Sequence, residues 1–161
     1  MEMMDVVDKE DSVISTVPKS EIYEKSLTHR IVHVLVFNNE GKMAIQLRSV
    51  SVSFCPAHWS TTAGGHVQAG ETYEQAALRE YQEELGVTST IRFFSKDFYI
   101  AKGTPPKFIV AFKTVFNGPF HPDPADVEKV CFFTIAEIKK MTAGAEKFHP
   151  ELLFLLKKYF F

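Results

Sequence analysis

Cysteine is scarce in this sequence: Cys55 and Cys131 are the only two among 161 residues. Two cysteines cannot make the disulfide framework of a small secreted protein, so we interpret both as reduced thiols of a cytoplasmic protein. Long apolar runs are also missing, because the longest cluster, Leu152 to Leu156, is far below the ~20 residues that span a bilayer. The N-terminus lacks the basic start and apolar stretch of a signal peptide. We therefore expect a soluble, cytoplasmic protein with no membrane partner.

An excess of basic charge is absent as well. Lysine and arginine number 18 and aspartate and glutamate 20, which gives a net charge of −2. No global field draws such a protein onto nucleic acid, so nucleic acid is not expected as a partner. A ligand that carries phosphate would need a local source of positive charge, such as a bound metal ion.

The sequence is rich enough in apolar residues, at 45% hydrophobic, to form a core, and its length fits one domain over residues 1–161. Residues 1–20 suit either an N-terminal hairpin or a flexible arm. Apolar patterning predicts strands at 31–37, 43–47, 91–100, 108–116 and 127–133, and helices at 72–85, 134–141 and 150–160. Strands interleaved with helices in one core predict an α/β or α+β sandwich.

The helix at 72–85 carries unusual acidic residues. Thr72 and Gln75 have capping-box spacing, so the helix start, and with it the rotation of each side chain, is fixed locally. Glu84 falls within the apolar arc and Glu80 at its edge, whereas Arg79 is expected to reach Glu83 and to point away from Glu80 and Glu84. A solvated acidic face is the ordinary interpretation of clustered glutamates, but carboxylates at the edge of a core need a neutralising partner. A divalent cation such as Mg²⁺ prefers these oxygen ligands.

The segment before this helix, Ala63 to Glu71, contains the pair Gly64 and Gly65, and Gly70. We interpret it as a loop in which the paired glycines let the backbone approach a ligand. Alone, such a loop is a weak sign of a site. Beside three clustered carboxylates, it becomes a candidate wall of the same pocket.

These residues together resemble the Nudix box, the signature of the Nudix hydrolase superfamily. Five residues separate Gly65 from Glu71 and seven separate Glu71 from Arg79, which opens the run Arg79-Glu80-Tyr81-Gln82-Glu83-Glu84-Leu85-Gly86-Val87. Tyr81 departs from the pattern, which usually has an aliphatic residue there, and its hydroxyl would need a buried partner. The resemblance implies an α/β/α sandwich around a mixed β-sheet and hydrolysis of a diphosphate linked to another moiety.

The resemblance also implies roles for individual residues. Glu83 and Glu84 match metal-binding carboxylates, Glu80 matches a ligand or general base, and the carbonyl of Gly64 or Gly65 would complete the shell around Mg²⁺ or Mn²⁺. Arg79 and Glu71 match positions that orient these carboxylates. Which glutamate acts as the base stays open.

Segments outside the box, including 5–11, His29-Arg30 and Pro56 to Trp59, look like the Nudix branch related to isopentenyl diphosphate isomerase. The isomerase cysteine would stand five residues after Trp59, where this sequence has Gly64, and Cys55 precedes Trp59. Its two further glutamates correspond roughly to Pro105 and Lys107. Isomerase activity is therefore disfavoured.

Other residues are assigned more locally. We assign His29, Arg30, Trp59 and His66 to substrate binding, with a hydrogen-bonded structural pair as the alternative for His29 with Arg30 and core packing as that for Trp59. Glu128 is proposed as a further metal ligand against a solvated surface charge, and His33 as a satisfied core histidine. At the C-terminus, Leu153, Phe154 and Phe160 need cover from either a homodimer contact or neighbouring loops.

We therefore expect a Mg²⁺-dependent pyrophosphohydrolase acting on a nucleoside diphosphate derivative or a related small diphosphate. The competing hypothesis is a non-catalytic nucleotide-binding Nudix domain, which would have no need of the full acid cluster.

Overall fold

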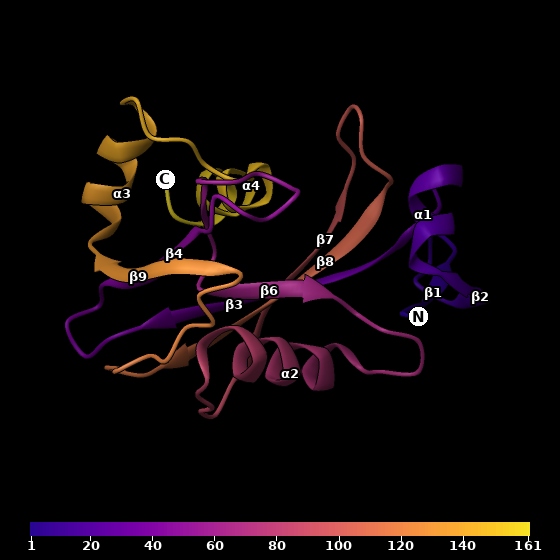
Figure 1. Cartoon of the computed structure of the whole chain (residues 1–161), viewed down its shortest axis with the longest axis horizontal. Coiled ribbons are helices and arrows are strands. Elements are labelled where there is room, and N and C mark those ends of the chain that lie inside the picture. The colour runs from indigo at the N-terminus through magenta and orange to yellow at the C-terminus, as the bar shows by residue number, and fades with distance from the viewer.

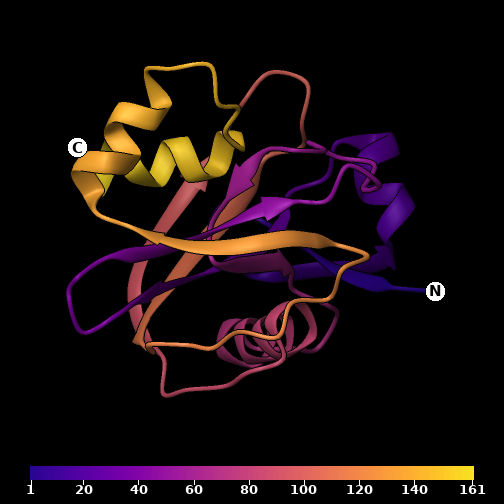
Figure 2. The ribbon, with the colours of Figure 1, turned by 60° about the vertical axis from the view of Figure 1, so that its left-hand side comes forward.

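A computed structural model describes all residues 1–161, and it has three layers (Figure 1). The middle layer is a seven-stranded mixed sheet formed by β3 (His29–Phe37), β4 (Met43–Arg48), β5 (Trp59–Ser60), β6 (Ala63–His66), β7 (Arg92–Tyr99), β8 (Lys107–Val115) and β9 (Val127–Phe133). Helix α2 (Tyr73–Leu85) covers one face, and α3 (Ile135–Thr142) and α4 (Pro150–Tyr159) cover the other, in both views of the ribbon (Figures 1 and 2). The predicted α/β/α sandwich around a mixed sheet is confirmed.

Alternation along the central strands builds the two cores. On β3, Val32, Val34 and Val36 face α2, while Leu35 faces α4. Both faces of β3 are therefore buried, as the continuous apolar run predicts. Strand β8 runs parallel to β3 along its whole length, and β7 pairs antiparallel with β8.

The helix boundaries follow local chemistry. Thr72 caps α2 in a complete capping box with Gln75, and Gly86 ends it in the left-handed conformation at φ 65°. Thr134 and Glu137 form the same box at the start of α3. The buried hydroxyl of Tyr81 finds its partner in Ser89, at 3.1 Å, as its position predicts.

The first twenty residues form a hairpin of β1 (Met3–Val7) and β2 (Val13–Pro18), which leads into α1 (Lys19–Lys25), a helix that the sequence pattern did not predict. This lobe lies at one end of the molecule, beside the loop that precedes α2 (Figure 1). None of the helices is long and apolar enough to cross a bilayer.

The apolar C-terminus is covered by the chain's own strands. Phe154 packs on Tyr99 with ring centroids 5.1 Å apart, and Phe160 packs on Phe94 at 5.6 Å. Phe154 and Phe160 are therefore partly covered within one chain, mainly by β7 instead of by the neighbouring loops, and Leu153 is also partly buried. A homodimer stays a prediction.

Candidate active site

A split in the sheet creates the main cavity. The chain passes from β5, which pairs with β4, through Thr61-Thr62 to β6, which pairs with β3. Since β3 and β4 pair directly only at Phe37 and Met43, the two halves of the sheet diverge beyond that point. A cavity of about 510 Å³ lies there and reaches residues from both faces of the sheet.

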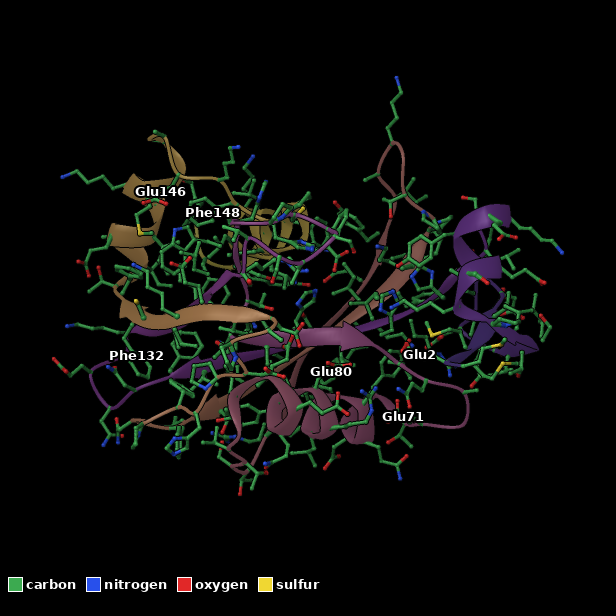
Figure 3. The ribbon with its side chains drawn as sticks, in the orientation of Figure 1. Glu2, Glu71, Glu80, Phe132, Glu146 and Phe148 are labelled. Atoms are coloured by element: carbon green, nitrogen blue, oxygen red, sulfur yellow. The ribbon has the colours of Figure 1, made fainter.

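Two glutamates of α2 form one wall of this cavity, Glu80 and Glu84. The backbone N–H of Gly64 donates to Glu84 Oε1 at 2.9 Å, and the Gln46 amide approaches the same oxygen at 3.4 Å. Figure 3 shows Glu80 between α2 and β6. The rotation of α2 thus brings both carboxylates to the strand that carries the paired glycines.

The paired glycines lie in β6, which corrects the prediction of a loop. A Cβ atom on Gly65 would lie 2.4 Å from the Glu80 carboxyl carbon, and one on Gly64 would lie 2.7 Å from His33 Nδ1. Because neighbouring residues of a strand face opposite sides, the glycines admit Glu80 on one side and His33 on the other. Close approach, and not an unusual backbone angle, explains both glycines.

Arg79 holds the acids together. It donates to both oxygens of Glu71 at 2.7 and 2.9 Å, to Glu80 at 2.8 Å, and to Glu83 at 3.3 Å. The expectation that Arg79 points away from Glu80 is wrong, because the long guanidinium reaches back over the helix surface. Glu83 is the exposed member, with 59% of its side chain accessible, and it is not among the residues that line the cavity.

Burial perturbs the two cavity carboxylates. It raises the pKa of Glu80 to about 7, although Arg79 opposes the shift, and the pKa of Glu84 to about 8, although Gly64 opposes it. Gln46 Oε1 is buried beside Glu84 without a hydrogen-bond partner. The unpartnered amide oxygen of Gln46 and the second carboxylate oxygens of Glu80 and Glu84, which accept no hydrogen bond, are suited to a hard divalent cation. The structure assembles no ready-made group of three or more His, Cys, Asp or Glu side chains that could hold a metal, so Glu83 would have to leave Arg79 to join such a site.

A second polar wall comes from the α4 side of the sheet. His33 on β3 and Lys107 on β8 both contact Glu151, which lies in the first turn of α4. These three residues and His149 line the cavity. Burial lowers the pKa of His149 to about 4. Burial alone would raise the pKa of Glu151. Its contacts with His33 and Lys107 lower that pKa by more, so it lies below its ordinary value.

The N-terminal lobe closes one end of the cavity with Glu2, Lys19 and Tyr23. The Tyr23 hydroxyl is hydrogen-bonded to His66 Nε2, and the ring of His66 stacks on that of His29 with centroids 5.7 Å apart. His66 lines the cavity, whereas His29 is fully buried behind it. Burial lowers the pKa of His66 to about 3 and that of His29 to about 4.

Besides Arg79, Glu83 and His29, three further residues assigned from the sequence do not line the cavity. Trp59 is 3% exposed, packs on Phe133 and donates to Glu146, because β5 turns it toward α3 and α4 and turns Ser60 toward the cavity. Arg30 forms an ion pair with Asp11 at 2.7 Å instead of lining the cavity, a partner that the sequence pattern did not predict.

The third is Glu128, which is exposed and does not line the cavity; the acid of this segment that does so is Asp126. The thiol of Cys55 does not line the cavity either. His33 is buried and hydrogen-bonded on both ring nitrogens, as predicted for a satisfied histidine, yet it also faces the cavity.

Sequence reasoning missed the wall of Lys107, His149 and Glu151. A lysine and a glutamate are ordinary surface residues by type, and only the pairing of β3 with β8 and the docking of α4 bring them together. A usable signal was present, because Lys107 directly precedes the apolar run Phe108 to Phe112 and Glu151 precedes the apolar residues of α4.

Comparison with known proteins points in one direction. The NUDIX domain profile matches residues 27–153. An uncharacterised Nudix hydrolase of Yersinia pestis is 33% identical over 153 residues, with 95% of this chain and 82% of the relative covered. Another, YfcD of Escherichia coli K12, is 32% identical over 152 residues, with 94% and 83% covered.

Solved structures agree at the level of the fold. The crystal structure of DR0079 from Deinococcus radiodurans superposes with a TM-score of 0.85 at 24% identity, covering 99% of this chain and all of that one. The NUDIX domain of Shewanella oneidensis NrtR, solved with ADP ribose, has a TM-score of 0.65 at 16% identity, covering 88% and 96%. The narrower resemblance to the isomerase-related branch stays a prediction. The chain belongs to the Nudix family, and it is an enzyme of the hydrolase type that acts on phosphoanhydrides.

Proposed function

We propose that this protein is a divalent-metal-dependent pyrophosphohydrolase that cleaves a phosphoanhydride bond in a nucleoside diphosphate derivative or a related small diphosphate. The observation that carries the proposal is the meeting of Glu80 and Glu84 with the glycine strand β6 inside a cavity. Two buried carboxylates with raised pKa values are costly to the fold, which supports a role in chemistry for them.

The metal would be Mg²⁺ or Mn²⁺, held by Glu80, Glu83, Glu84 and the carbonyl of Gly64. When bound, such an ion supplies positive charge to phosphate oxygens and makes water more acidic. Glu128 does not line the cavity, whereas Asp126 does, so Asp126 is the better candidate for a further ligand.

The protein's own groups have distinct tasks. A carboxylate of Glu80 or Glu84 accepts the proton of the attacking water, a contribution that is typically worth ~10²–10⁴ in rate. Without a metal ion the pKa values of both groups are raised by burial, and a bound cation would lower them and keep both groups ionised, as acceptance of a proton requires. Arg79 positions Glu80, and the N–H of Gly64 positions Glu84.

The substrate phosphates would be met by cationic side chains on the cavity wall, Lys19 and Arg48, with His66 as a neutral partner. The relative solved with ADP ribose shows that a Nudix domain of this fold holds a diphosphate compound. ADP ribose is therefore a reasonable member of the first substrate panel.

Hydrolysis tests the proposal directly. Nucleotide sugars, dinucleoside polyphosphates, oxidised nucleotides and isoprenoid diphosphates are assayed with Mg²⁺ or Mn²⁺ for release of phosphate or mononucleotide. We expect Glu83→Gln to lose about two decades of rate or more. Glu74→Gln is the matched control, because Glu74 is exposed on the same helix and faces away from the site. Unchanged turnover in Glu83→Gln would refute the assignment.

Metal uptake gives a readout that is independent of turnover. Calorimetry should detect binding of Mg²⁺ or Mn²⁺, alone or with a diphosphate compound present, and Glu84→Gln should weaken it at least tenfold. Ligand binding without any product release would favour a non-catalytic binding domain. Failure to take up either metal under both conditions would overturn metal dependence.

A further inference from the structure

The wall formed by Lys107 and Glu151 has no part in the proposed hydrolysis. Lys107 is 4% exposed and Glu151 6% exposed, and both line the cavity. Their ion pair, Nζ to Oε2 at 2.9 Å, connects β8 to α4. The carboxylates of the hydrolytic site come from α2, on the other face of the sheet.

This pair is not explained by stability. Removing two charges from water costs several kcal/mol per ion, and replacing a buried ion pair by apolar residues is often neutral or stabilising. The neighbouring core on α4 is apolar, with Leu152, Leu155 and Leu156 among its members, so apolar side chains would be compatible with it. An ion pair that lines a cavity is therefore better explained by what the cavity binds.

The hydrogen bonds of the pair leave unused capacity on two residues that line the cavity, although the Lys107 ammonium also lies 5.9 Å from the centroid of the Tyr99 ring. An ammonium group has three N–H donors, and Lys107 directs one to Glu151 and another, at 3.3 Å, to the Thr104 hydroxyl. Each oxygen of Glu151 accepts one hydrogen bond, from His33 or from Lys107, and each retains a further lone pair. The wall thus presents a donor beside an acceptor.

The chemistry of this wall selects among possible substrate moieties. A further phosphate is not favoured, because Glu151 already compensates the charge of Lys107. An alkyl chain is not favoured either, since it would cover the ion pair without offering hydrogen bonds. A hydroxyl group both donates and accepts, so it can satisfy the wall completely.

We propose that Lys107 and Glu151 form a subsite that binds the hydroxyl groups of a sugar-like moiety attached to the diphosphate of the substrate. The inference rests on the proposed function, and it names the part of the substrate that this enzyme distinguishes. His33 acts as a positioning residue, because its Nε2 donates to Glu151 at 2.7 Å and fixes the carboxylate.

The test compares ribose 5-diphosphate with cyclopentylmethyl diphosphate, which keeps a five-membered ring on the diphosphate and lacks its hydroxyl groups. Release of inorganic phosphate gives kcat/KM for each. We expect the native enzyme to prefer the ribose compound by at least ~10²-fold, because a site built for hydroxyl groups rejects analogues that lack them. In Lys107→Met/Glu151→Leu this preference should fall at least tenfold.

Lys158→Met is the matched control. Lys158 also forms an ion pair between the sheet and α4, with Asp97 on β7, but neither residue lines the cavity. It should keep the native preference. If the double variant does not fold, as judged by circular dichroism, Glu151→Gln replaces it, since glutamine keeps the volume and loses the charge.

The outcomes separate the two proposals. Equal turnover of the two compounds by the native enzyme, or an unchanged preference in the double variant, would overturn the subsite and leave the hydrolase intact. If neither compound is hydrolysed, calorimetric binding of the same pair decides. A preference that the variant loses supports the subsite, and equal binding overturns it.

Discussion

Gly65 illustrates how one missing side chain can set an active-site geometry. Glu80 lies in the space that any Cβ at residue 65 would occupy. The obstructing atoms belong to the end of a flexible side chain and not to backbone, so the clash can be relieved by moving the carboxylate. The position is therefore more sensitive in chemistry than in stability.

Gly65→Ala should fold with a Tm close to that of the native protein and lose about 10² in kcat/KM, because a displacement near 1 Å of a catalytic group has costs of this order. Gly144→Ala serves as control, since a Cβ there meets only ordinary contacts, the nearest at 3.6 Å. Activity that survives Gly65→Ala would show that the position of Glu80 is unimportant.

Among contacts between secondary-structure elements, the carboxylate of Asp11 attaches the N-terminal hairpin to the rest of the domain. Asp11 accepts hydrogen bonds from Arg30, Tyr73 and Lys96, which belong to β3, α2 and β7. Burial alone would raise the pKa of Asp11. The hydrogen bonds from Lys96 and Arg30 lower it by more, so the pKa of Asp11 lies below its ordinary value. The hairpin leads into α1, whose Lys19 and Tyr23 line the cavity, so its attachment bears on the site.

Asp11→Ala should destabilise the protein by ~2–4 kcal/mol in urea unfolding, because it leaves the partly buried Arg30 without its partner. It should also raise KM, since the lobe that closes the cavity becomes less firmly held. Glu10→Gln, at an exposed neighbour without a side-chain partner, should change neither quantity. A loss of stability below 0.5 kcal/mol would contradict the fastening role.

Helix α2 has a second anchor at Tyr81, whose hydroxyl joins Ser89 and Thr114 in a buried hydrogen-bond chain. Tyr81→Phe should cost about 1 kcal/mol of unfolding free energy, the usual net value of such a bond. Its kcat should stay within a factor of two, because Tyr81 faces the core and not the cavity. Urea titration and steady-state kinetics measure the two effects.

For the whole molecule, histidines and carboxylates contribute with opposite signs to the dependence of stability on pH. His29 and His149 have pKa values of about 4, lowered by burial from an ordinary value near 6.5. As pH falls from 6.5 to 4, the unfolded chain takes up these protons and the folded chain does not. Below pH 4.5, the lowered pKa of Glu151 adds to the same trend.

The raised pKa values of Glu80 and Glu84 act in the opposite direction, because the folded chain takes up their protons at higher pH than the unfolded chain does. The histidine contribution is therefore measured as a difference between two proteins. As pH falls from 7 to 4.5, His29→Gln should gain about 2 kcal/mol of unfolding free energy relative to the native protein, because it lacks a group whose protonation favours the unfolded chain. Urea unfolding of both proteins at several pH values measures this difference, and an unchanged difference across the window would mean that His29 is not buried in the neutral form in solution.

The sequence was informative wherever local chemistry decides the structure. The capping box of Thr72 and Gln75 fixed the start of α2, and its rotation placed Glu84 against the core side. It was less informative where contacts are long-range. Gly64 and Gly65 were expected in a loop, because nothing local shows that β6 adds to β3.

Substrate-contact assignments had the same weakness. Arg30 pairs with Asp11, nineteen residues earlier in the chain, and Trp59 packs into the core beneath α3 and α4. Neither contact can be predicted from the spacing of residues in the sequence. Lys107 and Glu151 meet across forty-four positions. Such pairs depend on how the strands and α4 are packed, which no short motif encodes.

The glycine strand β6 also determines how substrate range can change. One residue of it faces Glu80 and the next faces His33, so a single backbone thickness separates the hydrolytic acids from the polar wall. Mutations can alter the side chains of the hydrolytic site or of the polar wall. They cannot easily change the distance between the two, because only the backbone of β6 separates them. Substitutions in the polar wall should therefore change which chemical group of the substrate is bound. The distance between that group and the hydrolytic carboxylates should stay the same.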